Sequence, residues 1–420
     1  MFDTDIIIVG GGAAGMIAAI FAAQNGADVL LLEKNERLGR KLAITGKGRC
    51  NVTNNCNLQT LLDNIPKNAR FLYGAFSRWS PQDTMRFFES LGVPLKTERG
   101  NRVFPVSDKA ADIVSALTKR LGELNVTIKR ENVRSLIIEN GACRGVNTRG
   151  GQFKADAVIL ATGGASYPKT GSDGFGYRLA EQAGHKIIPP RPSLCPLVTE
   201  EMWVAKAAGL TLKNAAIKLT YNGKPIYEDF GEAAFTNDGI SGATVLSASA
   251  HIPEAAVGEQ LSIVNCTLSI DLKPALSEQQ LDARILRDFA ALRGKTLADA
   301  LRKLLPSELI APFSELLELP LDKRTDEINK VSRKNLVKLL KNLTLNLKAL
   351  RPIDEAIITR GGVSTAEIDP KTMESRLCDG LFFAGELIDA DAYTGGFNLQ
   401  IAFATGTLSG ASAAEFVKNR

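Results

Sequence analysis

Residues 5–15 read Asp5-Ile6-Ile7-Ile8-Val9-Gly10-Gly11-Gly12-Ala13-Ala14-Gly15, and this stretch decides the fold. The β-branched run before the glycines predicts a short strand buried on both faces, which is typical of a parallel sheet. Residues 16–24 are rich in alanine and predict a helix, and residues 27–33 predict a second buried strand. Strand, helix and strand in this order form a βαβ unit, so the sequence predicts an α/β fold with a Rossmann-type sheet.

The glycine spacing in this stretch has a physical purpose. Gly10 permits a tight turn after the strand, Gly12 lets the backbone approach a pyrophosphate, and Gly15 lets helix and strand pack closely. The phosphate would lie at a helix N-terminus, where free N–H groups and the helix dipole favour an anion. Glu33 ends the second strand and can accept hydrogen bonds from a ribose diol, but it would repel a 2′-phosphate. The stretch therefore predicts binding of the adenosine half of FAD or NAD, and not of NADP.

The segments that follow favour FAD over NAD. The loop at residues 34–57 is dense in Gly, Lys, Arg and Asn, so Arg40 and Lys41 could neutralise a pyrophosphate while the glycines let the backbone lie against a flat ring. Further apolar strands end in glycine turns at residues 157–164 and 381–386. The final helix opens at residues 394–400, and its N-terminus would stabilise an anionic reduced flavin.

The residues expected to contact FAD lie in these turns and loops. They are Gly10, Gly12, Ala13, Ala14, Gly15, Glu33, Lys34, Arg40, Lys41, Gly46, Gly48, Arg49, Cys50, Asn51, Val133, Ala161, Thr162, Gly163, Gly385, Glu386, Gly396, Phe397, Asn398 and Leu399. The six cysteines form no C-x-x-C pair and the two histidines lie far apart, so we expect neither a metal site nor a disulfide framework.

The same motifs resemble the flavoprotein family known as HI0933-like, a family of NAD(P)/FAD-dependent oxidoreductases. Its shared segments are GGGAAG, GRK…TGxGRCNxTN, ATGG and FAGE…D…TGGxN, which this chain carries from Gly10, Gly39, Ala161 and Phe383 onward. The resemblance implies non-covalently bound FAD in a two-lobed flavin domain with a β-rich insert and a helical insert. It also implies an ene reduction, because some members are described as reducing carbon–carbon double bonds, including those of oxidised bile acids, and others are linked to dihydrouridine formation in ribosomal RNA.

A proline-rich run, Pro189-Pro190-Arg191-Pro192, marks an expected domain boundary. Short strand-like runs follow it, and residues 277–350 are mostly helical in pattern. We expect a split FAD-binding domain at residues 1–190 and 355–420, a β-rich insert domain at 191–275 and a helical subdomain at 276–354.

The proton donor is expected near the flavin ring. Because flavin supplies the redox chemistry, the protein needs only a donor and substrate orientation. The candidates are Cys50, Tyr167, Asp391 and Tyr393. Two of them have a structural alternative, since Cys50 is typically a small packed residue in such a loop and Asp391 could hold the ribityl chain or cap a turn.

The sequence predicts a FAD-dependent oxidoreductase that reduces an activated C=C bond, with hydride supplied through the flavin from NAD(P)H. The chain has no second GxGxxG motif, so NAD(P)H is expected as a transient co-substrate. One alternative is an RNA-modifying flavoenzyme that forms dihydrouridine in ribosomal RNA. Another is a non-catalytic flavin-binding redox sensor, in which Cys50 or Cys56 would oxidise reversibly.

One segment of the insert bears on the RNA alternative. Residues 329–353 contain seven basic residues and no acid, and leucines gather on one face of a helical wheel with lysines opposite. The pattern predicts a basic amphipathic helix over residues 330–351. Such a helix would pack on a core with a solvated lysine face, bind RNA phosphates, or lie on a membrane surface.

The expected location is the cytoplasm. The N-terminus lacks the basic region and cleavage site of a signal peptide, and no apolar run is long enough to span a bilayer. A net charge of +5 is small for this length, and free thiols favour a reducing compartment. We expect a small-molecule or RNA partner and no stable membrane association, while the pattern makes no prediction of oligomeric state.

Overall fold

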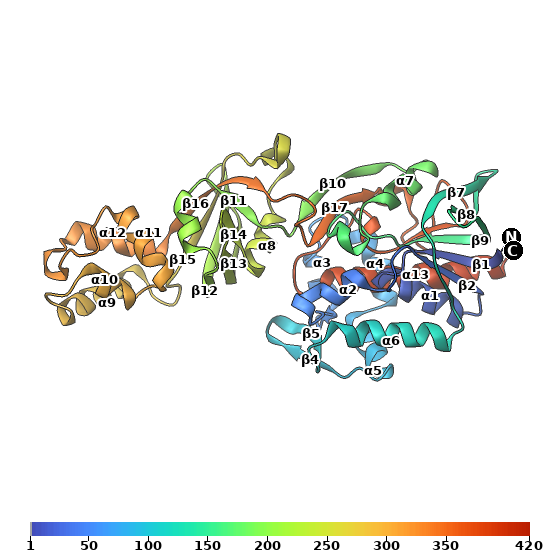
Figure 1. Ribbon diagram of the computed structural model, residues 1–420, viewed down its shortest axis with the longest axis horizontal. Coiled ribbons are helices and arrows are strands. Elements are labelled where there is room, and N and C mark those ends of the chain that lie inside the picture. Colours follow the sequence, from blue (N-terminus) through green and yellow to red (C-terminus); the bar gives the residue numbers. More distant parts are fainter. Residues whose placement is uncertain (1) are drawn as a thin grey trace. The chain divides into compact units, whose positions relative to one another are not determined.

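The computed structural model describes residues 2–420, with side chains from residue 4 onward (Figure 1). The chain forms two compact units. The split unit joins the N-terminal part up to Ser193 to Ile353–Arg420, and the insert unit comprises Leu194–Pro352. The two ends of the chain therefore build one unit together.

A seven-stranded sheet forms the centre of the split unit. β1 (Phe2–Val9) lies between two parallel neighbours, β2 (Val29–Glu33) and β9 (Gln152–Leu160). The order is β6-β2-β1-β9-β8-β7, with β18 also paired to β9. The remaining strands are β6 (Thr127–Arg130), β7 (Val133–Glu139), β8 (Ala142–Thr148) and β18 (Leu381–Phe383). The predicted α/β Rossmann-type fold, split between the two ends of the chain, is confirmed.

Hydrophobic cores cover both faces of this sheet. Ile6 and Ile8 lie in one core and Ile7 lies in the other, because side chains alternate along a strand. The covering helices are α1 (Ala13–Gln24), α2 (Arg40–Ile44), α3 (Leu58–Asp63), α4 (Ala69–Arg78), α5 (Pro81–Ser90), α6 (Ala110–Glu123), α7 (Phe175–Gln182) and α13 (Phe397–Lys418).

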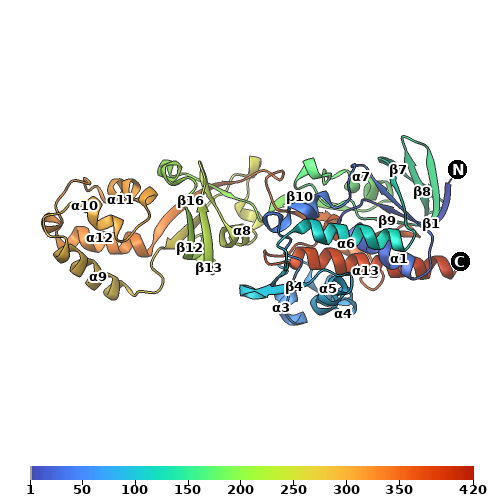
Figure 2. The ribbon, with the colours of Figure 1, turned by 60° about the horizontal axis from the view of Figure 1, so that its bottom comes forward.

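The first and last helices pack directly against each other (Figure 2). A Cβ on Gly406 of α13 would lie 2.5 Å from the Ala14 carbonyl oxygen, and one on Gly410 would lie 2.2 Å from that of Ala18. No larger side chain fits at either position, so the two glycines set how closely α1 and α13 approach.

Two smaller sheets complete the split unit. One contains β3 (Thr53–Asn54), β5 (Arg102–Pro105) and β4 (Leu95–Glu98). The other is an antiparallel ribbon of β10 (Ile187–Ser193) and β17 (Ile358–Val363), which are the segments that lead into and out of the insert unit.

The insert unit contains a closed barrel and a group of helices. The barrel strands are β11 (Leu197–Thr199), β14 (Gly239–Ser241), β13 (Lys224–Phe235), β12 (Thr211–Tyr221), β15 (Cys266–Asp271) and β16 (Leu343–Leu350), in that order. The helices are α8 (Ala243–Ser249), α9 (Glu278–Ala291), α10 (Leu297–Arg302), α11 (Ile310–Leu317) and α12 (Lys330–Lys341). In Figure 1 the last four gather at one end of the unit, beyond the barrel strands.

The predicted basic helix over residues 330–351 is wrong in its second half. The helix α12 ends at Lys341, and residues 343–350 form the barrel strand β16. In β16 the leucines at alternate positions are buried, and this period of two is the strand signal that the helical wheel hid. Part of the basic face is also neutralised, because Arg333 pairs with Asp282 and Lys341 pairs with Asp271.

Within residues 2–420, no helix combines the length and the apolar character that crossing a bilayer requires.

Candidate functional site

A cleft opens in the split unit at the carboxyl end of β1. Gly10 follows the strand with φ 103°, and a Cβ there would lie 2.6 Å from the carbonyl oxygen of Ala161. A Cβ on Gly15 would lie 1.8 Å from the Gly10 carbonyl oxygen, so α1 starts pressed against the turn. A Cβ on Gly12 would meet nothing within 4 Å, so the N-terminus of α1 faces open space. That N-terminus can accept an anion.

Glu33 is fixed beside this turn. Its Oε2 accepts a hydrogen bond from the Gly11 N–H (2.8 Å). Its Oε1 accepts hydrogen bonds from the backbone N–H and the side-chain Nδ2 of Asn35, both at 2.7 Å. Because a carboxylate has about four acceptor positions, Glu33 keeps capacity for a ligand hydroxyl.

Segments from the start, the middle and the end of the chain line the cleft, which encloses about 1360 Å³ with part of its open mouth included. The predicted cofactor residues among its lining are Gly10, Gly12, Ala13, Ala14, Glu33, Lys34, Arg40, Lys41, Val133, Ala161, Thr162, Gly163, Glu386, Asn398 and Leu399. The structure therefore brings together residues that are almost 400 positions apart in sequence, from Gly10 to Leu399.

Other predicted cofactor residues lie outside this lining. They are Gly15, Gly46, Gly48, Arg49, Cys50, Asn51, Gly385, Gly396 and Phe397. Arg49 forms ion pairs with Glu98 and Asp108, and its guanidinium lies over the ring of Phe104. Arg49 thus fastens the loop to the small sheet that contains β5.

The cleft lining also includes residues that were not predicted from the sequence, among them Phe175 and Leu179 of α7. Another such segment is Thr170–Asp173, which approaches the loop after β2 through the Lys34–Asp173 ion pair (2.7 Å). The glycines at 171 and 174, which follow the turn at residues 161–164, could have indicated that this segment belongs to the site. Ile357 and Ile358 also line the cleft, and no motif marks them because they simply follow the insert in the chain.

A polar network joins two residues that line the cleft, Lys41 and Glu386. Lys41 Nζ lies 2.5 Å from Glu386 Oε2 and 2.6 Å from Ser166 Oγ. Glu386 Oε1 accepts hydrogen bonds from Ser166 Oγ and from the Thr359 N–H, each at 2.9 Å. Lys41 was expected to neutralise a pyrophosphate, but it is paired with the carboxylate of Glu386. The ion pair holds both side chains in place at the cleft.

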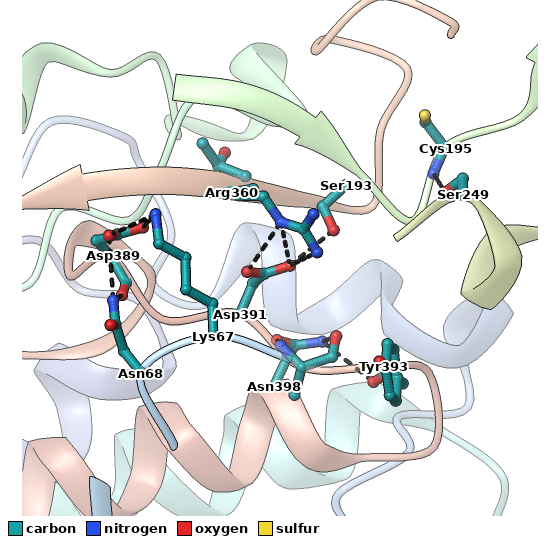
Figure 3. A network of polar contacts seen from close by, with 12 residues as sticks. Lys67, Asn68, Ser193, Cys195, Ser249, Arg360, Asp389, Asp391, Tyr393 and Asn398 are labelled. Atoms are coloured by element: carbon teal, nitrogen blue, oxygen red, sulfur yellow. Dashed lines mark hydrogen bonds and ion pairs between the residues drawn. The ribbon is translucent and has the colours of Figure 1, made fainter. Parts of the chain in front are cut away.

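Asn398 in the first turn of α13 holds the preceding loop (Figure 3). Its Oδ1 accepts a hydrogen bond from the Ala392 N–H (2.9 Å), and its Nδ2 donates to the Ala392 carbonyl (2.7 Å). Gly396 caps the helix with φ 99°, and a Cβ there would lie 2.4 Å from the carbonyl oxygen of Thr53. These contacts fix the N-terminus of α13, whose residues Asn398 and Leu399 line the cleft.

Two buried carboxylates anchor the same loop, one on each side of Ala390, which lines the cleft (Figure 3). Lys67 Nζ lies 3.0 Å from Asp389. Arg360 Nη2 lies 3.3 Å from Asp391 Oδ2, and that oxygen also accepts a hydrogen bond from Ser193 Oγ (2.7 Å).

This geometry separates the four predicted proton donors. Cys50 is fully buried, and burial raises the pKa of its thiol to about 12. Asp391 lies in an ion pair and accepts hydrogen bonds, so it is suited to hold the loop. Neither Cys50 nor Asp391 lines the cleft.

The two tyrosines are half-buried and also lie outside the lining. Burial raises the pKa of Tyr393 above its usual value; the positive charge of Arg360 opposes this shift, and the negative charge of Asp391 adds to it. Tyr167 adopts φ 53°, a left-handed conformation that non-glycine residues seldom occupy, directly after network residue Ser166.

The cleft residues fit FAD. The open N-terminus of α1 suits a pyrophosphate, and Glu33 suits the hydroxyls of an adenosine ribose. The N-terminus of α13 suits the electron-rich edge of a flavin. Thr162 Oγ1 is buried in the lining without a hydrogen-bond partner among residues 2–420, as expected of a group that completes its bonding with a ligand.

Comparisons with known proteins agree with this cleft. A 3-dehydro-bile acid delta(4,6)-reductase of Clostridium scindens is 34% identical over 412 residues, which cover 97% of this chain and 98% of that protein. A ribosomal RNA dihydrouridine synthase of Escherichia coli K12 is 29% identical over 406 residues, covering 96% of each chain. Among solved structures, the 3-ketosteroid delta1-dehydrogenase of Sterolibacterium denitrificans superposes with a TM-score of 0.53 at 15% identity and full coverage of both chains, which shows a shared fold.

The family model described as HI0933-like protein Rossmann domain matches residues 4–412. This range takes in the first glycine turn, the insert unit and most of α13. The resemblance identified from the motifs is therefore confirmed, and the chain belongs to the HI0933-like family of Rossmann-domain flavoproteins.

Proposed function

We propose that the chain is a FAD-dependent oxidoreductase that reduces an activated carbon–carbon double bond, with NAD(P)H as a transient hydride donor. The observation that carries the proposal is the cleft that Glu33 lines together with residues at the N-termini of α1 and α13. The similarity to a relative named as a bile acid reductase supports the choice of a double bond as substrate.

Bound FAD would supply hydride transfer, and the residues of the chain supply binding, orientation and a proton. Glu33 would hold the adenosine ribose, and the N-terminus of α13 would stabilise negative charge at the far end of the cleft. We assign proton donation to Tyr393, because it lies between the cleft residues Ala390 and Asn398 in the loop before α13 that Asn398 holds in place.

Flavin absorbance tests the proposal. Under anaerobic conditions, NADH or NADPH is expected to bleach the visible absorbance of the FAD-loaded protein, and an α,β-unsaturated ketone is expected to restore it. An absence of bleaching with either coenzyme would remove the NAD(P)H assignment. Bleaching that no alkene reverses would remove the double-bond assignment.

Formation of dihydrouridine in ribosomal RNA is a second candidate. The relative named as a ribosomal RNA dihydrouridine synthase supports it, and α12 keeps the exposed cations Lys330, Lys334 and Lys338 on a helix without acids. Phosphate contacts would make RNA affinity fall steeply with salt. Changing these three lysines to Glu should abolish RNA binding, whereas the matched exposed triple change K119E/K213E/K371E should not; equal RNA affinity of both variants would argue against this candidate.

A further inference from the structure

Residues 167–174, here called the strap, form a loop between the second glycine turn and α7. The carbonyl oxygen of Gly164 accepts hydrogen bonds from the Ser172 hydroxyl and from the Gly174 N–H, each at 3.0 Å. The strap is therefore anchored at its base, as in a compact surface loop whose ends lie together. Its residues 170–173 line the cleft.

The strap contacts the loop after β2, which lines the same cleft. Asn35 Nδ2 donates a hydrogen bond to the Thr170 carbonyl oxygen (3.2 Å), and Lys34 Nζ pairs with Asp173 Oδ2 (2.7 Å). A Cβ on Gly171 would lie 2.5 Å from Asn35 Nδ2, so the absence of a side chain there is what allows this close approach. Because all of these residues belong to the lining, the contacts join two parts of the cleft wall to each other.

The same contacts extend to the carboxylate that suits the adenosine ribose. The backbone N–H and Nδ2 of Asn35 both donate to Glu33 Oε1, and Asn35 Oδ1 accepts from Arg40 Nη1 (2.8 Å). The two amide hydrogens of Asn35 are thus divided between Glu33 and the strap. The strap is therefore joined to the part of the cleft that fits the adenosine half of FAD.

The ion pair between the strap and the loop after β2 is accessible to solvent. The Lys34 side chain is 29% exposed and that of Asp173 is 48% exposed. Exposed ion pairs are weak and are screened by salt, so this contact can open while the base of the strap stays anchored. Asp173 also places a negative charge in a cleft that fits an anionic dinucleotide. By charge alone it would weaken binding, whereas a role in holding the strap closed accounts for it.

We propose that Lys34, Asn35, Thr170 and Asp173 form a clasp that closes over the adenosine half of FAD and opens when FAD enters or leaves. The inference rests on the FAD site of the proposed function, and it assigns to that site the contacts that set how long the dinucleotide stays bound. Asn35 is a positioning residue of the clasp, since it links the strap to Glu33.

The rate of FAD release tests the clasp. Free flavin is collected by ultrafiltration at successive times after the FAD-loaded protein is diluted. D173N keeps the size of the side chain and the Oδ1 atom that accepts from the Phe175 N–H, but it replaces the Oδ2 atom that pairs with Lys34. We expect D173N to release FAD about two- to fivefold faster than the wild type, which is the size of one exposed ion pair. Removal of a negative charge without a clasp predicts slower release of an anion.

The matched control is D156N, which removes an exposed carboxylate that pairs with Arg144 outside the cleft lining and should release FAD at the wild-type rate. The double variant K34M/D173N should release FAD no faster than K34M, because both changes break one contact. The inference is overturned if D173N releases FAD at the rate of D156N or more slowly, or if the double variant releases it faster than K34M. A protein that takes up no FAD would instead remove the proposed function itself.

Discussion

Gly12 and Gly15 belong to one turn but have opposite steric surroundings. A Cβ on Gly15 would collide with the Gly10 carbonyl oxygen, whereas a Cβ on Gly12 would project into the cleft. We expect G15A to lower the free energy of unfolding by at least about 1–3 kcal/mol, through overpacking. We expect G12A to preserve stability and to weaken FAD binding, because its methyl group would occupy the approach of the pyrophosphate.

Urea unfolding of both variants without FAD, followed by FAD titration, separates the two effects. Equal stability of the two variants would contradict the packing role of Gly15. Unchanged FAD affinity in G12A would contradict a pyrophosphate at the N-terminus of α1.

Tyr393 is the proposed proton donor. Since its pKa is raised, the hydroxyl stays protonated through neutral pH, and proton donation should be lost only as pH rises above the usual tyrosine value of about 10. We expect Y393F to slow alkene reduction about 10²–10⁴-fold and to leave flavin reduction by NAD(P)H unchanged. Y167F is the matched variant, and stopped-flow absorbance measures both half-reactions. An equal loss in both variants, or an alkaline limb that persists in Y393F, would contradict the assignment.

At the residue scale, the sequence identified the turn glycines and Glu33 because their roles depend on local chain geometry. It could not rank Cys50, Asp391 and Tyr393, because burial and ion pairing depend on segments far along the chain.

At the element scale, α12 and β16 show that hydrophobic periodicity alone cannot always distinguish a helix from a strand. Leucines at 336, 339, 340, 343, 347 and 350 fit one helical face, but Leu345 does not, and its alternation with Leu343 and Leu347 indicates a strand. Short apolar segments often fit both periods, and here barrel closure between β11 and β15 favours the strand. The strand β1 and the helices α1 and α13 were predictable because strong local signals and tertiary packing agree.

Leu345 offers a direct test of the strand. It is fully buried in β16, whereas its neighbour Thr344 is exposed. We expect L345A to lower the free energy of unfolding by about 2–5 kcal/mol, and T344A to change it by less than about 0.5 kcal/mol. Urea unfolding of the full chain measures both, and similar values for the two variants would contradict the alternating burial.

At the scale of the whole molecule, one cleft depends on both ends of the chain. Residues near Gly10 and Leu399 line it together, and the packing of α13 on α1 brings them there. The chain divides into compact units after Ser193 and before Ile353, whereas the domain boundaries expected at residues 190 and 355 stay a prediction. The further division of the insert into a β-rich domain and a helical subdomain remains a proposal, since β16 returns to the barrel after the helices.

The most direct test of the account is the stoichiometry of FAD on the purified protein. We expect a yellow protein that holds one FAD per chain, releases it intact on denaturation, and loses affinity when Glu33 is changed to Gln. A colourless protein that takes up no FAD on incubation and dialysis would contradict the central claim that this cleft is a flavin site.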